Sequence, residues 1–276
     1  MAKAKENPVA VAEEQTTALG FVAEDIDESQ YVANFDFKAD EQAMAFLKQA
    51  QAMSAELNPT RPEYIEGLKQ GGFFISGINK VFNEGCFIIP CYMSHEHITW
   101  LPNNGGLVGK QPYSEEYQKT LIKDGSKNLT PEGNEVENAL SYYVLVVDPA
   151  NPNELPVPAM LKCASTKFTA AKKFNTLLNS AQFNAATKLG FKPPVYRFLA
   201  SIASVAQTNS QKQTFFNIDF KMTTAHPYLN KNGMIAVKVI LDMAKQLAEM
   251  AAANQLNVDY NADKTVSENI VDTDII

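Results

Sequence analysis

The sequence predicts an α+β fold built on an antiparallel sheet with flanking helices. Apolar and polar residues alternate in several stretches between residues 73 and 223, as they do along half-buried strands. Helical spacing of apolar residues is found in one stretch between those strands and in one stretch near each end of the chain. Strands that run together, with one helix before a closing hairpin, favour an antiparallel sheet over a parallel one.

Composition sets the broad class. The chain has 276 residues, of which 45% are hydrophobic and 20% charged, as is ordinary for one large or two small globular domains. No apolar run approaches the roughly 18 residues of a membrane span, so no membrane partner is predicted. The first 20 residues lack the apolar core of a secretory signal. Three cysteines, an odd number, favour reduced thiols and a cytoplasmic location.

The N-terminal part predicts an arm and then a helix. Residues 1–30 have clustered acidic residues and no sustained apolar period, so they predict a flexible acidic arm. Residues 31–62 form an N-terminal helical segment whose helix covers residues 40–57, with Asp40 as the cap. Apolar residues recur at helical spacing at Ala43, Phe46, Leu47, Ala50, Met53 and Leu57.

The middle of the chain changes to strand spacing. Residues 73–82 and 86–100 predict strands joined by a tight turn, and residues 140–148 are apolar on both faces, as a central strand is. Residues 158–165 alternate and predict a further strand. Residues 102–135 are a long connection, which in a compact domain is usually functional or mobile.

The remaining elements are a helix, a hairpin, a second helix and a tail. Residues 167–181 carry an apolar stripe at helical spacing. Residues 195–205 and 213–223 alternate and predict a hairpin, and a C-terminal helix lies within residues 231–255. Residues 256–276 predict an acidic tail.

The element order over residues 63–230 fits a five-stranded OB-type barrel, a fold that binds oligonucleotides on one face. Other α+β sheets fit the same order.

Charge is partitioned along the chain. The net charge is -7 over residues 1–59, +4 over residues 60–231 and -4 over residues 232–276. Between Leu155 and Ile218 there are eight basic residues and no Asp or Glu. A basic middle with acidic ends favours a body that binds a polyanion and ends that compete for it or recruit proteins.

Basic and aromatic residues on outward strand positions are what single-strand binding requires. Cationic side chains follow the phosphates, and aromatic rings stack on bases of any sequence. The alternative is a solvated lysine face with Phe215 packed under a helix. The candidate nucleic-acid-binding residues are Lys110, Tyr113, Lys119, Lys123, Lys162, Lys167, Lys172, Arg197, Lys212, Phe215 and Lys221.

The last residues have a pattern of their own. Asp272 and Asp274 precede the apolar pair Ile275 and Ile276. An acidic tail can occupy the protein's own basic groove until DNA displaces it, and its apolar end can dock in a partner's pocket. The alternative is an ordinary frayed terminus.

These features together resemble bacterial and phage-type single-stranded-DNA-binding proteins. The resemblance rests on the basic and aromatic body over about residues 70–225 and on the acidic tail with its apolar end. The segment from Trp100 to Gly109 is also similar to one found in tailed-phage replication proteins. Members of the family end in Phe, whereas this chain ends in Ile276. The resemblance implies passive coating of single strands during replication, recombination or repair, with replication or recombination proteins as further partners and no cofactor.

Metal and enzyme functions have weaker signals. Cys86, Cys91, His95 and His97 contain zinc-ligand residue types, but the cysteine spacing falls in a strand-like run, and buried thiols with surface histidines are favoured. The chain has no P-loop, G-x-S-x-G or H-E-x-x-H motif, so catalysis is not expected. A non-catalytic structural or protein-interaction protein, such as a virion component or a host-factor inhibitor, is the alternative function. Neither the oligomeric state nor a preference for DNA over RNA follows from the sequence.

Overall fold

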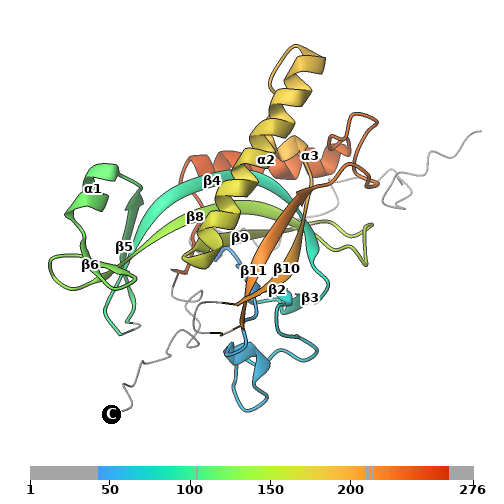
Figure 1. Cartoon of the computed structure of the whole chain (residues 1–276). Coiled ribbons are helices and arrows are strands. Elements are labelled where there is room, and N and C mark those ends of the chain that lie inside the picture. The colour runs from blue at the N-terminus through green and yellow to red at the C-terminus, as the bar shows by residue number, and fades with distance from the viewer. Residues whose placement is uncertain (1–42, 104, 209–211, 213, 261–276) are drawn as a thin grey trace, which may run out of the picture.

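The computed structural model describes residues 43–103, 105–208, 212 and 214–260 (Figure 1). Its two longest strands, β4 (Cys86–Trp100) and β8 (Glu135–Val147), pair antiparallel over nearly their whole length and form an arched ribbon through the molecule (Figure 1). β4 has the bounds that its apolar pattern predicts. The predicted arm of residues 1–30 and the tail beyond residue 260 lie outside the described residues.

The β4–β8 ribbon is widened at both ends into an eight-stranded sheet. At one end, β10 (Ala200–Thr208) pairs with β4 and with β11 (Thr214–Met222), while β9 (Val157–Ala164) pairs with β8. At the other end, β5 (Leu107–Pro112) pairs with β4, and β7 (Lys127–Leu129) pairs with β8 and with β6 (Ile122–Asp124). Every one of these pairings is antiparallel, so the α+β antiparallel class is confirmed.

A small second sheet lies between the edges of β9 and β11. It consists of β1 (Leu47–Gln49), β2 (Phe73–Ile75) and β3 (Lys80–Phe82). Phe46 forms an isolated parallel bridge with Met160 of β9. On the other side, the Gln51 side chain donates to the Phe216 carbonyl and accepts from the Phe216 amide, at 2.9 Å each. Side-chain hydrogen bonds, and not strand pairing, therefore connect the small sheet to β11. The described sheet does not close into the predicted OB-type barrel.

The helix predicted over residues 40–57 is wrong for its described part. Residues 43–57 contain β1 and the short 3-10 helix η3 (Ala55–Leu57). Phe46 and Leu47, which share a helical stripe with Ala50, instead point to opposite sides of an extended segment and enter two different cores. Pairing with β2 and β9 outweighs the local helical preference, which is a weak determinant of structure.

The first core lies between the sheet and α2 (Thr166–Leu189). Ala171, Phe174 and Leu178 of α2 are buried there, and the Phe174 ring stacks on Phe220 of β11 with 4.4 Å between centroids. All three residues lie between the start and the middle of the helix, and the part that follows extends beyond the sheet (Figure 1). Gly190, at φ +77°, ends the helix in the left-handed conformation that glycine adopts readily.

The second core lies on the other face of the sheet under α3 (Lys238–Ala252). Ile240, Ala244 and Leu247 pack there against sheet residues such as Leu145. The predicted C-terminal helix is thus present, beginning at Lys238. Residues 256–260, the first part of the predicted tail, are packed on this core, with Tyr260 buried beside Phe46 at 6.1 Å between ring centroids.

The connection over residues 102–135 contains more structure than predicted. It holds β5, β6, β7 and α1 (Glu115–Thr120), whose N-terminus is capped by the Ser114 side chain accepting from the Tyr117 amide at 3.3 Å. β4 and β8 extend past the packed body, and their free edges there provide pairing partners for these short strands.

Candidate nucleic-acid interface

Five aromatic side chains gather where β4 passes the first turn of α2. The His95 ring lies parallel to Tyr113, with 3.9 Å between centroids and 6° between planes, and its centroid is 5.7 Å from that of Phe168. The His97 ring is 4.8 Å from Tyr113 and 5.1 Å from Tyr117. We call these five residues the aromatic cluster. The cluster joins β4, α1 and α2, which are distant in the sequence.

Hydrogen bonds hold the cluster in place. The Tyr113 amide donates to the His95 carbonyl at 2.8 Å, and His95 Nε2 is 2.7 Å from Asn138 Oδ1. His97 Nε2 is 3.3 Å from the Ser114 carbonyl, which can only accept, so this nitrogen carries the proton. Burial lowers the pKa of His97 below its ordinary value, and the ring is therefore neutral at pH 7.

The other four rings are partly open to solvent. His95, Tyr113, Tyr117 and Phe168 are half-buried, whereas His97 is fully buried beneath them. Half-buried rings with fixed orientation are the kind of surface on which an unpaired base can stack.

Cationic side chains lie beside this surface on α2, and others lie on α1 and β6. Lys172 is exposed on α2, with its ammonium group 4.8 Å from the centroid of the Phe168 ring. Lys167 lies in the first turn of the same helix, which contains no acidic residue. Lys119 on α1 and Lys123 on β6 are exposed. Glu115 and Glu116 occupy the first turn of α1, where negative charge stabilises the helix N-terminus.

Two predicted binding residues form ion pairs on the opposite face of the sheet. Lys110 Nζ is 3.6 Å from Glu96 Oε1 and 5.1 Å from the centroid of the Tyr260 ring. Lys162 Nζ is 2.9 Å from Glu137 Oε2 and 5.4 Å from the Trp100 ring. Both lysines therefore have protein partners, and they do not join the aromatic cluster.

The remaining predicted residues lie at three other places. Lys212 is exposed in the β10–β11 connection, and Phe215 is half-buried near the start of β11. Lys221 is exposed at the other end of β11, with its ammonium group 3.0 Å from Asp219. Arg197 ends the 3-10 helix η4 (Val195–Arg197), and its Nε is buried with no hydrogen-bond partner among the described residues. The structure thus brings Tyr113 and Lys172 to the aromatic cluster, with Lys167 next to Phe168 in the first turn of α2, while the other predicted residues are dispersed. The four predicted tail residues, Asp272, Asp274, Ile275 and Ile276, lie outside the described residues.

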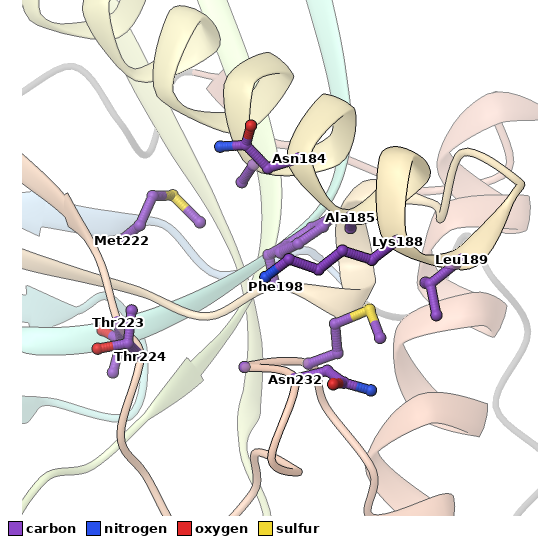
Figure 2. A pocket seen from close by; sticks show the side chains of 12 residues that line it. Asn184, Ala185, Lys188, Leu189, Phe198, Met222, Thr223, Thr224 and Asn232 are labelled. Carbon is purple, nitrogen blue, oxygen red and sulfur yellow. The ribbon is translucent and has the colours of Figure 1, made fainter.

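Two hollows flank α2. One, of about 200 Å³, lies between the second half of α2 and the chain that follows β11. Figure 2 shows the Lys188 side chain extending from α2 toward Phe198 at this hollow. The other, of about 260 Å³, lies between the middle of α2 and β4, and it is lined by Tyr92, Met93, Asn175, Leu178, Asn179 and Gln182, with Pro90, Tyr142 and Val195.

The zinc hypothesis gains no support from the described residues. Within them, no three or more His, Cys, Asp or Glu side chains are grouped as a metal site would require. A bulge between Pro90 and Tyr92 shifts the alternation of β4, so Cys91 enters the core under α3 while His95 belongs to the aromatic cluster. Burial raises the pKa of Cys91 and of Cys163 to about 12, and that of Cys86 further still. The three thiols are thus protonated and structural.

Sequence reasoning did not identify the aromatic cluster as a unit. Their residue types make His95 and His97 candidate zinc ligands, and helical spacing assigns Phe168 to the apolar stripe of residues 167–181. The alternation His-x-His on a strand, next to a loop with Tyr113 and Tyr117, is the signal that points to a shared face.

The helices that the structure describes lack the combination of length and apolar character needed to span a lipid bilayer. No curated protein and no solved structure matches the chain. A family model described as Pam3 phage gp34-like protein matches residues 13–257, which include every described element of the fold and the whole aromatic cluster. The chain therefore belongs to the Pam3 phage gp34-like protein family.

Proposed function

We propose that this protein binds single-stranded DNA without sequence preference and without catalysis, coating it in the host cytoplasm during phage DNA replication, recombination or repair. The observation that carries the proposal is the aromatic cluster at the N-terminal end of α2, next to Lys167 and Lys172. Membership of a phage family supports the setting.

The chemistry of the cluster favours a single strand over a duplex. Bases expose their faces for stacking only when they are unpaired, and each base stacked on an aromatic side chain contributes about 1–3 kcal/mol. His95, Tyr113 and Phe168 offer such faces. The phosphates between stacked bases need cations, and α2 supplies four lysines and no acidic residue.

The curved sheet also supports this function. OB-type barrels bind oligonucleotides on a curved antiparallel sheet. Here Gln49 and Gln51 bridge from the β1 segment to β11, so an open sheet acquires a barrel-like interior.

The acidic tail is the second part of the proposal. Its carboxylates compete with DNA for the lysines around the aromatic cluster, and Ile275 and Ile276 dock on a replication or recombination protein.

The test is fluorescence anisotropy of a labelled oligo-dT with the full chain, over a range of salt concentrations. We expect tight, salt-sensitive binding. The Lys172→Gln substitution should lower the slope of log affinity against log salt by about 0.7, the value for one phosphate contact. Lys245→Gln is the matched control, because Lys245 is an exposed helical lysine on α3, which covers the other face of the sheet. Equal slopes for both variants would contradict the role of Lys172.

A chain ending at Ala262 tests the tail. It keeps the packed residues through Tyr260 and should bind oligo-dT more tightly in low salt than the full chain does. No binding by either chain in low salt would exclude the DNA function and favour the structural or protein-interaction alternative.

A further inference from the structure

We infer that the hollow between α2 and β4, which we call the amide pocket, holds one unpaired base of the bound strand. The inference rests on the proposed function and adds to it a site that the aromatic cluster does not include. The amide pocket consists of Tyr92, Met93, Asn175, Leu178, Asn179, Gln182 and the three residues that complete its lining.

The amide pocket lies next to the aromatic cluster on the same two elements, α2 and β4. Asn175 lies seven residues after Phe168 on α2, a distance of about 10 Å along a helix. Met93 lies two residues before His95 on β4, and residues two apart in a strand share a face. Phe168 contacts His95, and Asn175 faces the same hollow as Met93, so the two sites neighbour each other where α2 crosses β4 (Figure 1).

Three amide side chains lie along one side of α2 at this hollow. Asn175, Asn179 and Gln182 are spaced four and three residues apart, so they share a helix face. Tyr142 donates its hydroxyl to Asn175 Oδ1 at 2.7 Å, which leaves the amino group of Asn175 as a donor. Gln182 Nε2 donates to the Pro193 carbonyl at 2.8 Å, which leaves Gln182 Oε1 as an acceptor.

This donor and acceptor set matches a base rather than a phosphate. Neutral amides pair with the polar edges of bases, as Asn and Gln do in DNA recognition. Among the residues that the structure describes, no charged side chain lines the amide pocket, so a phosphate would gain no ion pair from them there. Tyr92, Met93 and Leu178 supply apolar contacts for the flat faces, and Met93 is 39% exposed although it is apolar.

Size agrees with this ligand. The amide pocket has a volume of about 260 Å³, below the roughly 300–1,000 Å³ of sites for drug-sized molecules. It therefore suits one base with its sugar outside. The hollow near the end of α2 differs, because Lys188 lines it and its walls include Phe198 and Met222 (Figure 2).

The test compares Asn179→Leu with the control Asn184→Leu. Both are asparagines of α2, and Asn184 lines the other hollow, nearer the end of the helix (Figure 2). Asn179 is exposed, so its replacement leaves the core intact. The probes are a labelled oligo-dT and an oligonucleotide of equal length made of abasic sugar phosphates. A second readout is the fluorescence of one 2-aminopurine placed within oligo-dT.

We expect Asn179→Leu to weaken oligo-dT binding about fivefold or more, with abasic binding and the salt slope unchanged. The change in 2-aminopurine fluorescence on binding should shrink in parallel. Asn184→Leu should match the natural chain in every measurement. If the natural chain binds oligo-dT and Asn179→Leu binds it equally well, the amide pocket is not a base site while the proposed function stands. If the natural chain does not bind oligo-dT, the proposed function itself fails.

Discussion

Two of the basic side chains form ion pairs with carboxylates, one buried (Glu96) and one half-buried (Glu137). Glu96 is buried, and its carboxylate accepts hydrogen bonds from Tyr260 at 2.9 Å and Ser141 at 3.3 Å and lies 3.6 Å from the Lys110 ammonium. A buried charge is costly unless it is paired and hydrogen-bonded, so Lys110 stabilises the fold. Lys162 pairs with the half-buried Glu137 at 2.9 Å. Lys167 and Lys172, beside the aromatic cluster, are the basic residues that we expect at the phosphates.

Tyr113 is the residue at which stacking is best tested. Its ring lies parallel to His95, and it is half-buried. Tyr113→Ala should weaken oligo-dT binding about 5- to 150-fold, the equivalent of one base stack of about 1–3 kcal/mol. Tyr113→Phe should bind normally, and the salt slope should be unchanged in both variants because no charge is lost. Tyr64→Ala, at an exposed loop tyrosine, is the control in the same anisotropy assay. Normal binding by Tyr113→Ala would exclude this ring from the interface.

His97 makes the stability of the fold pH-dependent. Burial lowers its pKa below the ordinary value of 6.5, so the unfolded chain takes up a proton first as the pH falls. The contribution of His97 to the free energy of unfolding should therefore have its full value above about pH 7. It should decrease from about pH 6.5 downward until the folded ring is protonated. His226, whose pKa is also lowered by burial, adds to the same decrease.

Urea unfolding at pH 7.5, 6 and 5 measures this effect. His97→Gln should show a smaller loss of unfolding free energy between pH 7.5 and 5 than the natural chain shows. An equal loss in both chains would mean that His97 is not the titrating group.

Among the elements, the long strands and the helix α2 could be predicted because their patterns are strong and local. The apolar run of β4 gives its bounds, and the alternation of residues 216–222 gives the core face of β11. The segment around Phe46 could not be predicted, since its conformation depends on β2 and β9, which come later in the chain. The two ion pairs could not be predicted either. Glu96 and Glu137 lie outside the acid-free stretch, and they reach Lys110 and Lys162, respectively, only because the strands pair.

The turn between β3 and β4 depends on Gly85. This residue has φ +98°, and a Cβ there would overlap the Ile202 carbonyl oxygen of the neighbouring strand β10. Gly85→Ala should therefore destabilise the protein by about 3 kcal/mol or more, from backbone strain and steric overlap together. Gly67→Ala is the matched control, because Gly67 has φ +78° but open space around it, and it should lose about 1–2 kcal/mol. Thermal unfolding measures both, and equal losses would show that the contact with Ile202 relaxes without cost.

At the scale of the whole molecule, one sheet separates two cores, and its two faces carry different features. The face under α2 carries the aromatic cluster and the amide pocket at its margin. The face under α3 carries the ion pairs of Lys110 and Lys162 and the last described residues of the chain. The C-terminal segment is part of this second core, because the Met44 amide donates to the Asn257 carbonyl at 2.8 Å and Tyr260 is buried. Folding and the tail are therefore coupled at Tyr260.

Truncation on either side of Tyr260 separates these two roles. A chain ending at Val258 loses a buried aromatic ring and leaves Glu96 with Ser141 as its remaining hydroxyl donor. It should be less stable by about 3–5 kcal/mol, as other buried aromatic deletions are, and should melt about 10 °C lower. A chain ending at Ala262 keeps Tyr260 and should melt as the full chain does, so that a change in its DNA affinity reports the loss of acidic charge alone. Calorimetry of the three chains tests this, and equal melting temperatures for all of them would mean that Tyr260 does not hold the C-terminal segment to the sheet.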